Sequence, residues 1–164
     1  MRHDARGRTR ETERAVDLAG GTTSGGSGAD SLSGIEVVAG STHNDTFAGS
    51  AAADTFYGGA GDDTLAGGGG ADTLHGESGN DLFLWQRGEG NDTVSGGAGW
   101  TDTITIQANG LGSGNGDWTL NLTSGSVTSS GAGVHDLSAD AAGTINFNDG
   151  SQIAFDGLEK IQWT

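Results

Sequence analysis

The chain contains no cysteine and no proline, and only seven of its 164 residues are Lys or Arg. The lack of cysteine excludes a disulfide scaffold. No apolar run approaches the roughly 18 residues that span a membrane, so we expect no membrane insertion. The first residues also lack the apolar stretch of a cleavable signal peptide, so export would need another route. Because 22 residues are acidic, the formal net charge is −15. Such a surface repels nucleic acid and anionic membranes, and it favours a cation as partner.

Glycine is abundant, with 33 residues, and it belongs to a regular repeat. An aspartate recurs every nine residues, a glycine precedes each aspartate by five positions, and a large apolar residue follows each by two. The aspartates are Asp45, Asp54, Asp63, Asp72 and Asp81, and the apolar residues are Phe47, Phe56, Leu65, Leu74 and Phe83. Asp92 with Val94 and Asp102 with Ile104 continue the pattern at spacings of eleven and ten. A stretch of similar sequence at 25–33 is out of step with this array.

Each nine-residue unit predicts a six-residue loop followed by a three-residue strand. Glycine permits the tight loop, and alternation along the strand turns one large side chain inward. Two units then make one flattened coil of eighteen residues. We expect Phe47, Leu65 and Phe83 to stack in one internal column. We expect Phe56 and Leu74, followed by Val94, to stack in the facing column.

The aspartates explain what stabilises such a thin core. One buried side chain per unit contributes about 2 kcal/mol, whereas ordering nine residues costs about 1 to 2 kcal/mol each. Stacking also aligns Asp45, Asp63 and Asp81 on one edge, and carboxylates about 5 Å apart repel by roughly 3 kcal/mol per pair. A divalent cation between the loops replaces this repulsion between carboxylates with attraction. Oxygen ligands in flexible loops favour calcium over magnesium.

The repeat resembles the RTX family, the hemolysin-type calcium-binding nonapeptide G-G-x-G-x-D-x-U-x. Residues 58–66 and 67–75 fit the motif in full, and residues 76–84 depart from it only at Glu77. Two upstream units carry His43 and Ala52 in place of the fourth-position glycine. The resemblance covers roughly residues 25–106. It implies an all-β fold, a right-handed parallel β-roll with two short strands per 18-residue coil, binding several Ca²⁺ ions.

The resemblance also implies the site residues and the partners. The expected calcium ligands are the motif aspartates, with Asp92 closing one edge, and the loop glycines shape the sites and offer carbonyl oxygens. These residues are Asp45, Asp54, Asp63, Asp72, Asp81, Asp92, Gly58, Gly61, Gly67, Gly70, Gly76 and Gly79. The side chains at the variable fifth position, such as Asp62, are expected to form the loop rather than bind the ion. A type I secretion system is the implied export machinery, and the outside of a bacterial cell is the implied location.

Three segments are expected. Residues 1–20 would be a linker or a disordered segment, or would form a short helix around 11–19. Residues 21–106 would be the calcium-binding roll, and residues 107–164 a β-rich cap that carries the secretion signal. In the cap, Trp118, Leu120 and Leu122 alternate as in a strand. A hairpin is predicted around the turn at Asp149, and an apolar strand or turn at 158–163.

No catalytic motif is present, so we expect no enzyme activity from this chain. The sequence lacks a G-x-S-x-G elbow, a cysteine nucleophile and H-E-x-x-H spacing. Calcium-triggered folding after export is the first function hypothesis. The alternative is a calcium-rigidified structural or adhesive module, which self-association or a surface ligand would favour. A third alternative is recognition of an ordered lattice by the threonines that precede the apolar residues.

Overall fold

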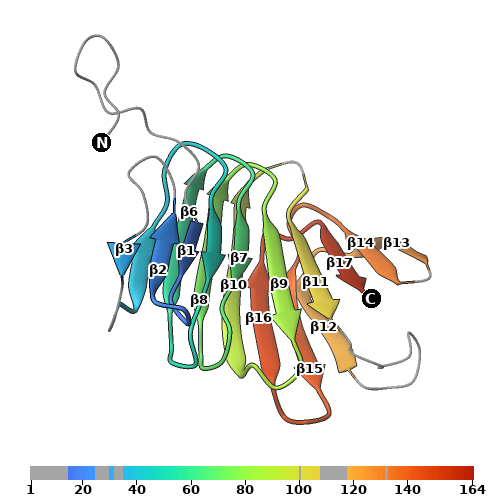
Figure 1. The fold of residues 1–164 in the computed structure, drawn as a ribbon. Helices are drawn as coiled ribbons and strands as arrows, with labels where there is room; N and C mark the ends of the chain where they lie inside the picture. The colour runs from blue at the N-terminus through green and yellow to red at the C-terminus, as the bar shows by residue number, and fades with distance from the viewer. Residues whose placement is uncertain (1–14, 25–29, 32–34, 100, 108–117, 132) are drawn as a thin grey trace.

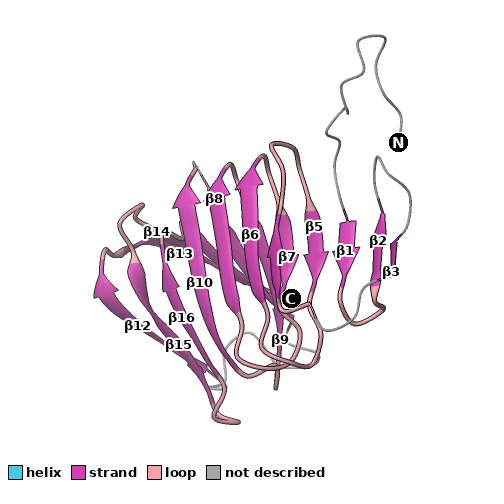
Figure 2. Cartoon of the chain, turned by 90° about the vertical axis from the view of Figure 1, so that its left-hand side faces the viewer, coloured by secondary structure: helices cyan, strands magenta, loops and turns pink. Residues whose placement is uncertain are grey.

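The computed structural model describes residues 15–24, 30–31, 35–99, 101–107, 118–131 and 133–164. Within them the chain forms 17 strands and no helix (Figures 1 and 2). The strands are β1 (Ala15–Asp17), β2 (Thr22–Ser24), β3 (Asp30–Ser31), β4 (Val37–Ala39), β5 (Thr46–Ala48), β6 (Thr55–Ala60), β7 (Thr64–Ala66), β8 (Thr73–Ser78), β9 (Leu82–Gln86), β10 (Asn91–Ala98), β11 (Thr103–Gln107), β12 (Trp118–Ser124), β13 (Val127–Gly131), β14 (Val134–Leu137), β15 (Ala142–Phe147), β16 (Gln152–Asp156) and β17 (Lys160–Trp163). The described part of the chain contains no helix long and apolar enough to cross a membrane.

The strands form two sheets. One has the order β13-β14-β17-β11-β9-β7-β5-β1-β2-β3, and the other has the order β12-β15-β16-β10-β8-β6-β4. Consecutive repeats alternate between the sheets, so β5, β7 and β9 are parallel neighbours in one and β6, β8 and β10 in the other. This is the predicted parallel β-roll. Thr46 pairs with Thr64, which confirms an eighteen-residue coil.

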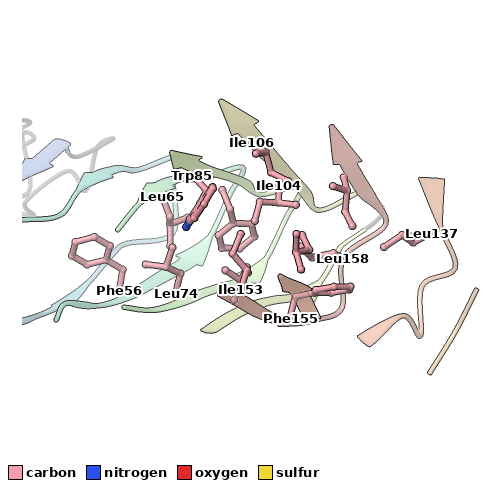
Figure 3. Packing of buried hydrophobic residues seen from close by; sticks show 14 of the residues in the cluster. Phe56, Leu65, Leu74, Trp85, Ile104, Ile106, Leu137, Ile153, Phe155 and Leu158 are labelled. Atoms are coloured by element: carbon pink, nitrogen blue, oxygen red, sulfur yellow. The ribbon is translucent and has the colours of Figure 1, made fainter. Parts of the chain in front are cut away.

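The core consists of the two predicted columns. In one, Leu65 is in register with both Phe47 and Phe83; in the other, Leu74 is in register with both Phe56 and Val94. All of these side chains are buried, and Figure 3 shows Phe56, Leu65 and Leu74 between the sheets. The alternation that places one large residue per unit inside therefore also sets the strand register.

Strand length differs between the sheets, which the uniform repeat did not predict. Strands β5 and β7 have three residues, as expected, whereas β6 and β8 have six and run on through the first three loop residues. Gly59 consequently pairs with Glu77 as a strand residue. The loops on that side are correspondingly shorter.

The N-terminal prediction was wrong where the structure describes it. Residues 15–17 are neither linker nor helix but strand β1, which pairs in parallel with β5 and buries Val16 against the repeat core. Val16 stands in register with Phe47, so it extends the first column by one level. Residues 1–14 and most of the early motif copy at 25–33 lie outside the described residues.

The C-terminal residues extend both sheets and confirm the expected strands. Strand β16 pairs in parallel with β10, and β17 pairs in parallel with β11. The predicted hairpin is β15–β16, and β12 pairs with β15 as its antiparallel neighbour. The last level of the roll is therefore covered by strands that carry no nonapeptide motif.

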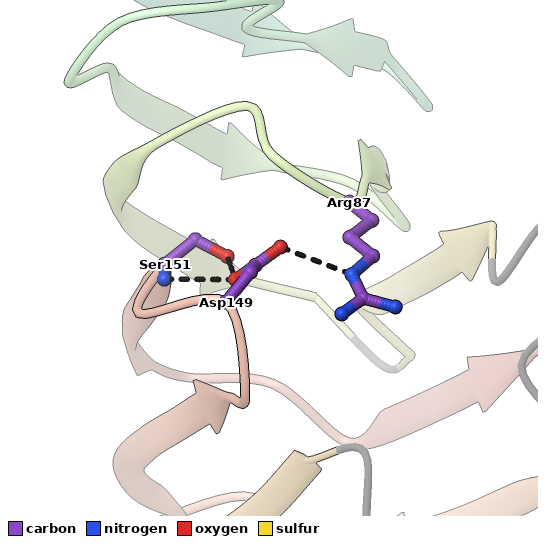
Figure 4. A network of polar contacts seen from close by, with 3 residues as sticks. All are labelled: Arg87, Asp149 and Ser151. Carbon is purple, nitrogen blue, oxygen red and sulfur yellow. Dashed lines mark hydrogen bonds and ion pairs between the residues drawn. The ribbon is translucent and has the colours of Figure 1, made fainter.

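Two contacts join β9 and the loop that follows it to the β15–β16 hairpin. The Trp85 and Phe147 rings stack with their centroids 3.9 Å apart. On the surface, Arg87 pairs with Asp149 at 3.2 Å (Figure 4). Hydrogen bonds from Ser151 lower the pKa of Asp149. An exposed pair of this kind contributes little to stability, so the buried ring contact is the stronger link.

Candidate calcium sites

The motif aspartates form a ladder at the points where the loops enter the strands. From Asp63 onward, each Oδ1 accepts a hydrogen bond from the backbone N–H of the aspartate one coil earlier, at the following N–O distances. They are 2.6 Å for Asp45 to Asp63, 2.8 Å for Asp54 to Asp72, 2.8 Å for Asp63 to Asp81, 3.0 Å for Asp72 to Asp92 and 2.8 Å for Asp81 to Asp102. We call this arrangement the carboxylate ladder. Its first edge contains Asp45, Asp63, Asp81 and Asp102, and its second contains Asp54, Asp72 and Asp92, which confirms the predicted alignment.

The aspartates of the ladder, each of which we call a rung, differ in whether their second carboxylate oxygen, Oδ2, has a hydrogen-bond partner. The Oδ2 atoms of Asp63, Asp72, Asp81 and Asp102 are buried and have no hydrogen-bond partner. Each of these aspartates is only 1% exposed. A buried, ionised oxygen without a donor is strongly unfavourable. A cation bound there removes the penalty, and oxygen donors of this type suit calcium.

Burial raises the pKa values of these carboxyl groups. The pKa of Asp63 and of Asp72 is raised to about 6, chiefly because burial disfavours the charged form. The pKa of Asp81 is raised to about 7 for the same reason. A backbone hydrogen bond opposes each shift, and the neighbouring ladder carboxylates add to it. Near neutral pH without a cation, the ladder therefore holds charges in an environment that disfavours them.

The loop glycines are required by close contacts. A Cβ on Gly58, Gly67 or Gly76 would lie 2.4, 2.3 or 2.2 Å from the Oδ2 of the aspartate in the same loop. The fourth-position glycines Gly61, Gly70 and Gly79 have φ values of 125°, 125° and 140°. A Cβ on any of them would also meet the backbone of the preceding coil. The predicted loop-shaping role is therefore confirmed for these six glycines, whereas ion binding by their carbonyl oxygens stays a prediction.

The second loop position controls whether Oδ2 is available. In the two upstream loops the backbone N–H groups of Ser41 and Ser50 donate to the Oδ2 atoms of Asp45 and Asp54, at 2.6 and 2.7 Å. The Ser50 hydroxyl adds a second bond at 3.0 Å. These loops therefore satisfy Oδ2 internally, although the Oδ1 of Asp54 is buried and has no hydrogen-bond partner. This difference between the upstream and downstream loops was not predicted. The sequence sign of it is the serine that replaces the second motif glycine in the two upstream loops.

Glu77 occupies this second position in the loop of Asp81, where the sequence departs from the motif. Its φ is 74°, the only positive value at a non-glycine residue in the described chain. Glu77 thus adopts the left-handed conformation of the glycines that it replaces, such as Gly68 at 87°. The Asp81 Oδ2 remains unpartnered as a result, so the departure at Glu77 leaves this site intact.

Replacing Glu77 with glycine is expected to stabilise the calcium-loaded chain by about 1 kcal/mol, because the left-handed conformation costs about 1 to 2 kcal/mol for a residue with a Cβ. Urea unfolding at saturating calcium measures the difference. Glu77→Ala is the matched control, since it removes the charge that acts on Asp63 but keeps the backbone strain. An E77G variant no more stable than E77A would contradict the strain argument.

Asp92 differs from the other predicted ligands because both of its oxygens have donors. Oδ1 accepts from the backbone of Asp72 at 3.0 Å, and Oδ2 accepts from the indole Nε1 of Trp85 at 2.8 Å. Trp85 lies in β9, at the position where the regular repeats have the first glycine. The predicted ion at Asp92 therefore has no unpartnered carboxylate oxygen to support it. The sequence sign of this difference is the spacing of eleven residues, instead of nine, between Asp81 and Asp92.

The fifth-position side chains form a second set of contacts, as the sequence predicted for loop-forming residues. Asn44 Oδ1 accepts from the backbone N–H of Asp62 at 3.0 Å, and Asp62 Oδ1 accepts from that of Asn80 at 2.8 Å. Asn80 Oδ1 accepts from Thr101 at 3.0 Å. These exposed groups tie adjacent loops together outside the carboxylate ladder.

The described residues contain no group of three or more His, Cys, Asp or Glu side chains placed to hold one metal ion. A calcium ion at the ladder would therefore combine one or two carboxylates with backbone oxygens from the loops. Calcium accepts six to eight oxygen ligands of mixed type. The unpartnered Oδ2 atoms and the glycine-lined space beside them fit such an ion. When bound, the ion would supply positive charge between carboxylates that otherwise repel.

A parallel β-roll with glycine-shaped loops and buried, unpartnered aspartate oxygens defines the chain as a calcium-binding repeat protein. Residues 39–74, 49–83 and 88–100 match the family described as RTX calcium-binding nonapeptide repeat (4 copies). Residues 39–83 and 88–100 of the chain thus carry RTX calcium-binding nonapeptide repeats. No curated protein matches it. RTX repeats are typical of secreted bacterial proteins.

Proposed function

We propose that this chain is a folding module triggered by calcium outside the cell, and that it supports the secretion and stability of an extracellular protein. The observation that carries the proposal is the set of four buried Oδ2 atoms without a partner. These oxygens place negative charge in the interior of the same loops that hold the roll together. Folding and ion binding are therefore energetically coupled.

Because folding is coupled to calcium binding, the chain would fold on only one side of the membrane, and export would proceed towards that side. Where calcium is scarce, the charged ladder disfavours the roll and the chain stays extended enough to pass a type I secretion system. Where calcium is plentiful, binding to the folded state alone stabilises that state by mass action. The RTX match supports this route and a location outside a bacterial cell. We assign no catalytic role to the chain, and any catalysis would belong to a domain outside it.

A second candidate is a calcium-rigidified structural or adhesive module. The C-terminal strands favour it, because they build an apolar core without motif aspartates. Ile145, Ile153, Leu158 and Ile161 are each 0% exposed there. A core of this kind can hold part of the roll together without ions, and calcium would then stiffen a fold that already exists.

Far-UV circular dichroism of the full chain during a calcium titration separates these functions. We expect a cooperative gain of β signal with calcium, reversal by a chelator, and little response to magnesium at the same concentration. Magnesium is the control because it demands a tighter octahedron and retains its waters. A spectrum that is already fully β in chelator would instead favour the structural module.

A further inference from the structure

Asp102 lies outside the residues that match the RTX repeat, yet it is a full rung of the carboxylate ladder. The match ends at residue 100, and ten residues separate Asp102 from Asp92 instead of nine. Even so, Asp102 Oδ1 accepts the backbone N–H of Asp81 at 2.8 Å. Asp102 is 1% exposed, and its Oδ2 has no hydrogen-bond partner. Asp102 thus shares its burial and its unpartnered Oδ2 with the motif aspartates Asp63 and Asp81.

The same two groups lie beside the first-position glycine at Asp81 and at Asp102: the aspartate Oδ2 and the carbonyl oxygen of a glycine in the next level. A Cβ on Gly76 would lie 2.2 Å from Asp81 Oδ2 and 2.6 Å from the carbonyl oxygen of Gly96, one coil later. A Cβ on Gly96 would lie 2.7 Å from Asp102 Oδ2 and 1.8 Å from the carbonyl oxygen of Gly157. Gly157 therefore occupies the place of a first-position motif glycine, although it follows Gly96 by a long stretch of chain rather than by one coil.

Glu159 completes the arrangement. Its Oε2 accepts the backbone N–H of Asp102 at 2.8 Å, just as each ladder aspartate accepts from the rung before it. A regular unit spaces its first glycine and its aspartate by five residues, whereas Gly157 and Glu159 are two apart. The longer glutamate side chain spans the difference. The charged side chains that act on Asp102 are Glu159 and Asp62, and both are acidic.

We propose that Asp102 and Glu159, with the carbonyl oxygen of Gly157, form an additional calcium site that closes the first edge of the ladder onto the C-terminal segment. This inference rests on the proposed function, because it assumes that the open Oδ2 atoms bind calcium. The site joins residues 57 positions apart. It links the ordering of β17 to the ion, since Glu159 immediately precedes that strand and its backbone N–H donates to the Asp102 carbonyl at 3.1 Å.

The bound ions of the full chain are counted by native mass spectrometry at saturating calcium, and the calcium affinities are measured by titration. Glu159→Gln removes the charge but keeps an acceptor for the Asp102 amide, and Asp102→Asn removes the open oxygen. Both are expected to hold one ion fewer than wild type, or to weaken one site by at least about tenfold, because carboxylate charge sets calcium affinity. Asp156→Asn is the matched control: it removes an exposed charge one residue before Gly157 and should keep the full count.

Unchanged ion numbers and affinities in both E159Q and D102N would overturn the proposal. A second measurement needs no variant: anomalous diffraction from wild-type crystals grown with calcium should show a peak within about 2.6 Å of Asp102 Oδ2. Peaks at Asp63, Asp72 and Asp81 without one at Asp102 would refute this site alone. A wild-type chain that binds no calcium at all would refute the proposed function as well.

Discussion

Replacing Asp63 with asparagine is expected to raise the calcium concentration at the folding midpoint by at least about tenfold, because the site loses a charged ligand. The Asp63 Oδ1 can still be mimicked, since an asparagine carbonyl can accept the Asp45 amide that now bonds it at 2.6 Å. The amide nitrogen would replace Oδ2, which has no partner in the structure. The hydrogen-bonded ladder would therefore survive while the ion site is lost. Circular dichroism or tryptophan fluorescence during a calcium titration gives the midpoint.

The neighbouring Asp62 provides the matched control. Asp62→Asn removes the same charge one residue away, at an exposed position whose Oδ1 accepts from Asn80, and it should move the midpoint by less than about twofold because exposed charges interact weakly. In chelator, without calcium, D63N should instead be more stable than D62N, because Asp63→Asn removes a buried charge. Equal midpoints for D62N and D63N would show that net charge, rather than the open oxygen, controls folding.

The periodic part of the fold could be predicted because one local rule repeats. A large apolar residue every ninth position leaves one register in which Phe47, Leu65 and Phe83 are all buried. The alignment of Asp45, Asp63 and Asp81 follows from that register without further information. These inferences need only the period of the sequence and the geometry of a strand.

The non-periodic parts could not be predicted because their contacts are distant in sequence. Nothing near residue 16 indicates that Val16 would join the Phe47 column. Glu159 likewise shows no local sign that it would accept from Asp102. The predicted ion at Asp92 shows a related limit. The motif places the aspartate correctly, but a side chain seven residues earlier, Trp85, supplies its second partner.

Acid is expected to favour the calcium-free roll, which is the second large effect. The carboxyl groups of Asp63 and Asp72 have pKa values raised from 3.8 to about 6 in the fold, and that of Asp81 to about 7. Between about pH 4 and pH 7 the folded chain thus binds more protons than the unfolded chain, and stability falls as the pH rises. A rise from 3.8 to about 6 corresponds to about 3 kcal/mol against each ionised carboxylate. In chelator, the β signal should therefore increase as the pH is lowered from 7.5 to 5.5.

The same carboxyl groups predict the opposite trend for calcium, because protons and calcium compete for one set of oxygens. The calcium affinity of the folded chain should rise with pH through 6 to 7, the range in which the calcium-free fold weakens. A variant with Asp63, Asp72 and Asp81 all changed to asparagine should lose most of the pH dependence of both the calcium-free fold and the calcium affinity. That result would assign both pH dependences to the carboxylate ladder rather than to net charge. A calcium-free chain with the same β content at pH 5.5 and pH 7.5 would contradict this assignment. Calcium would then stabilise the roll by bridging loops, and not by neutralising charges that the interior disfavours.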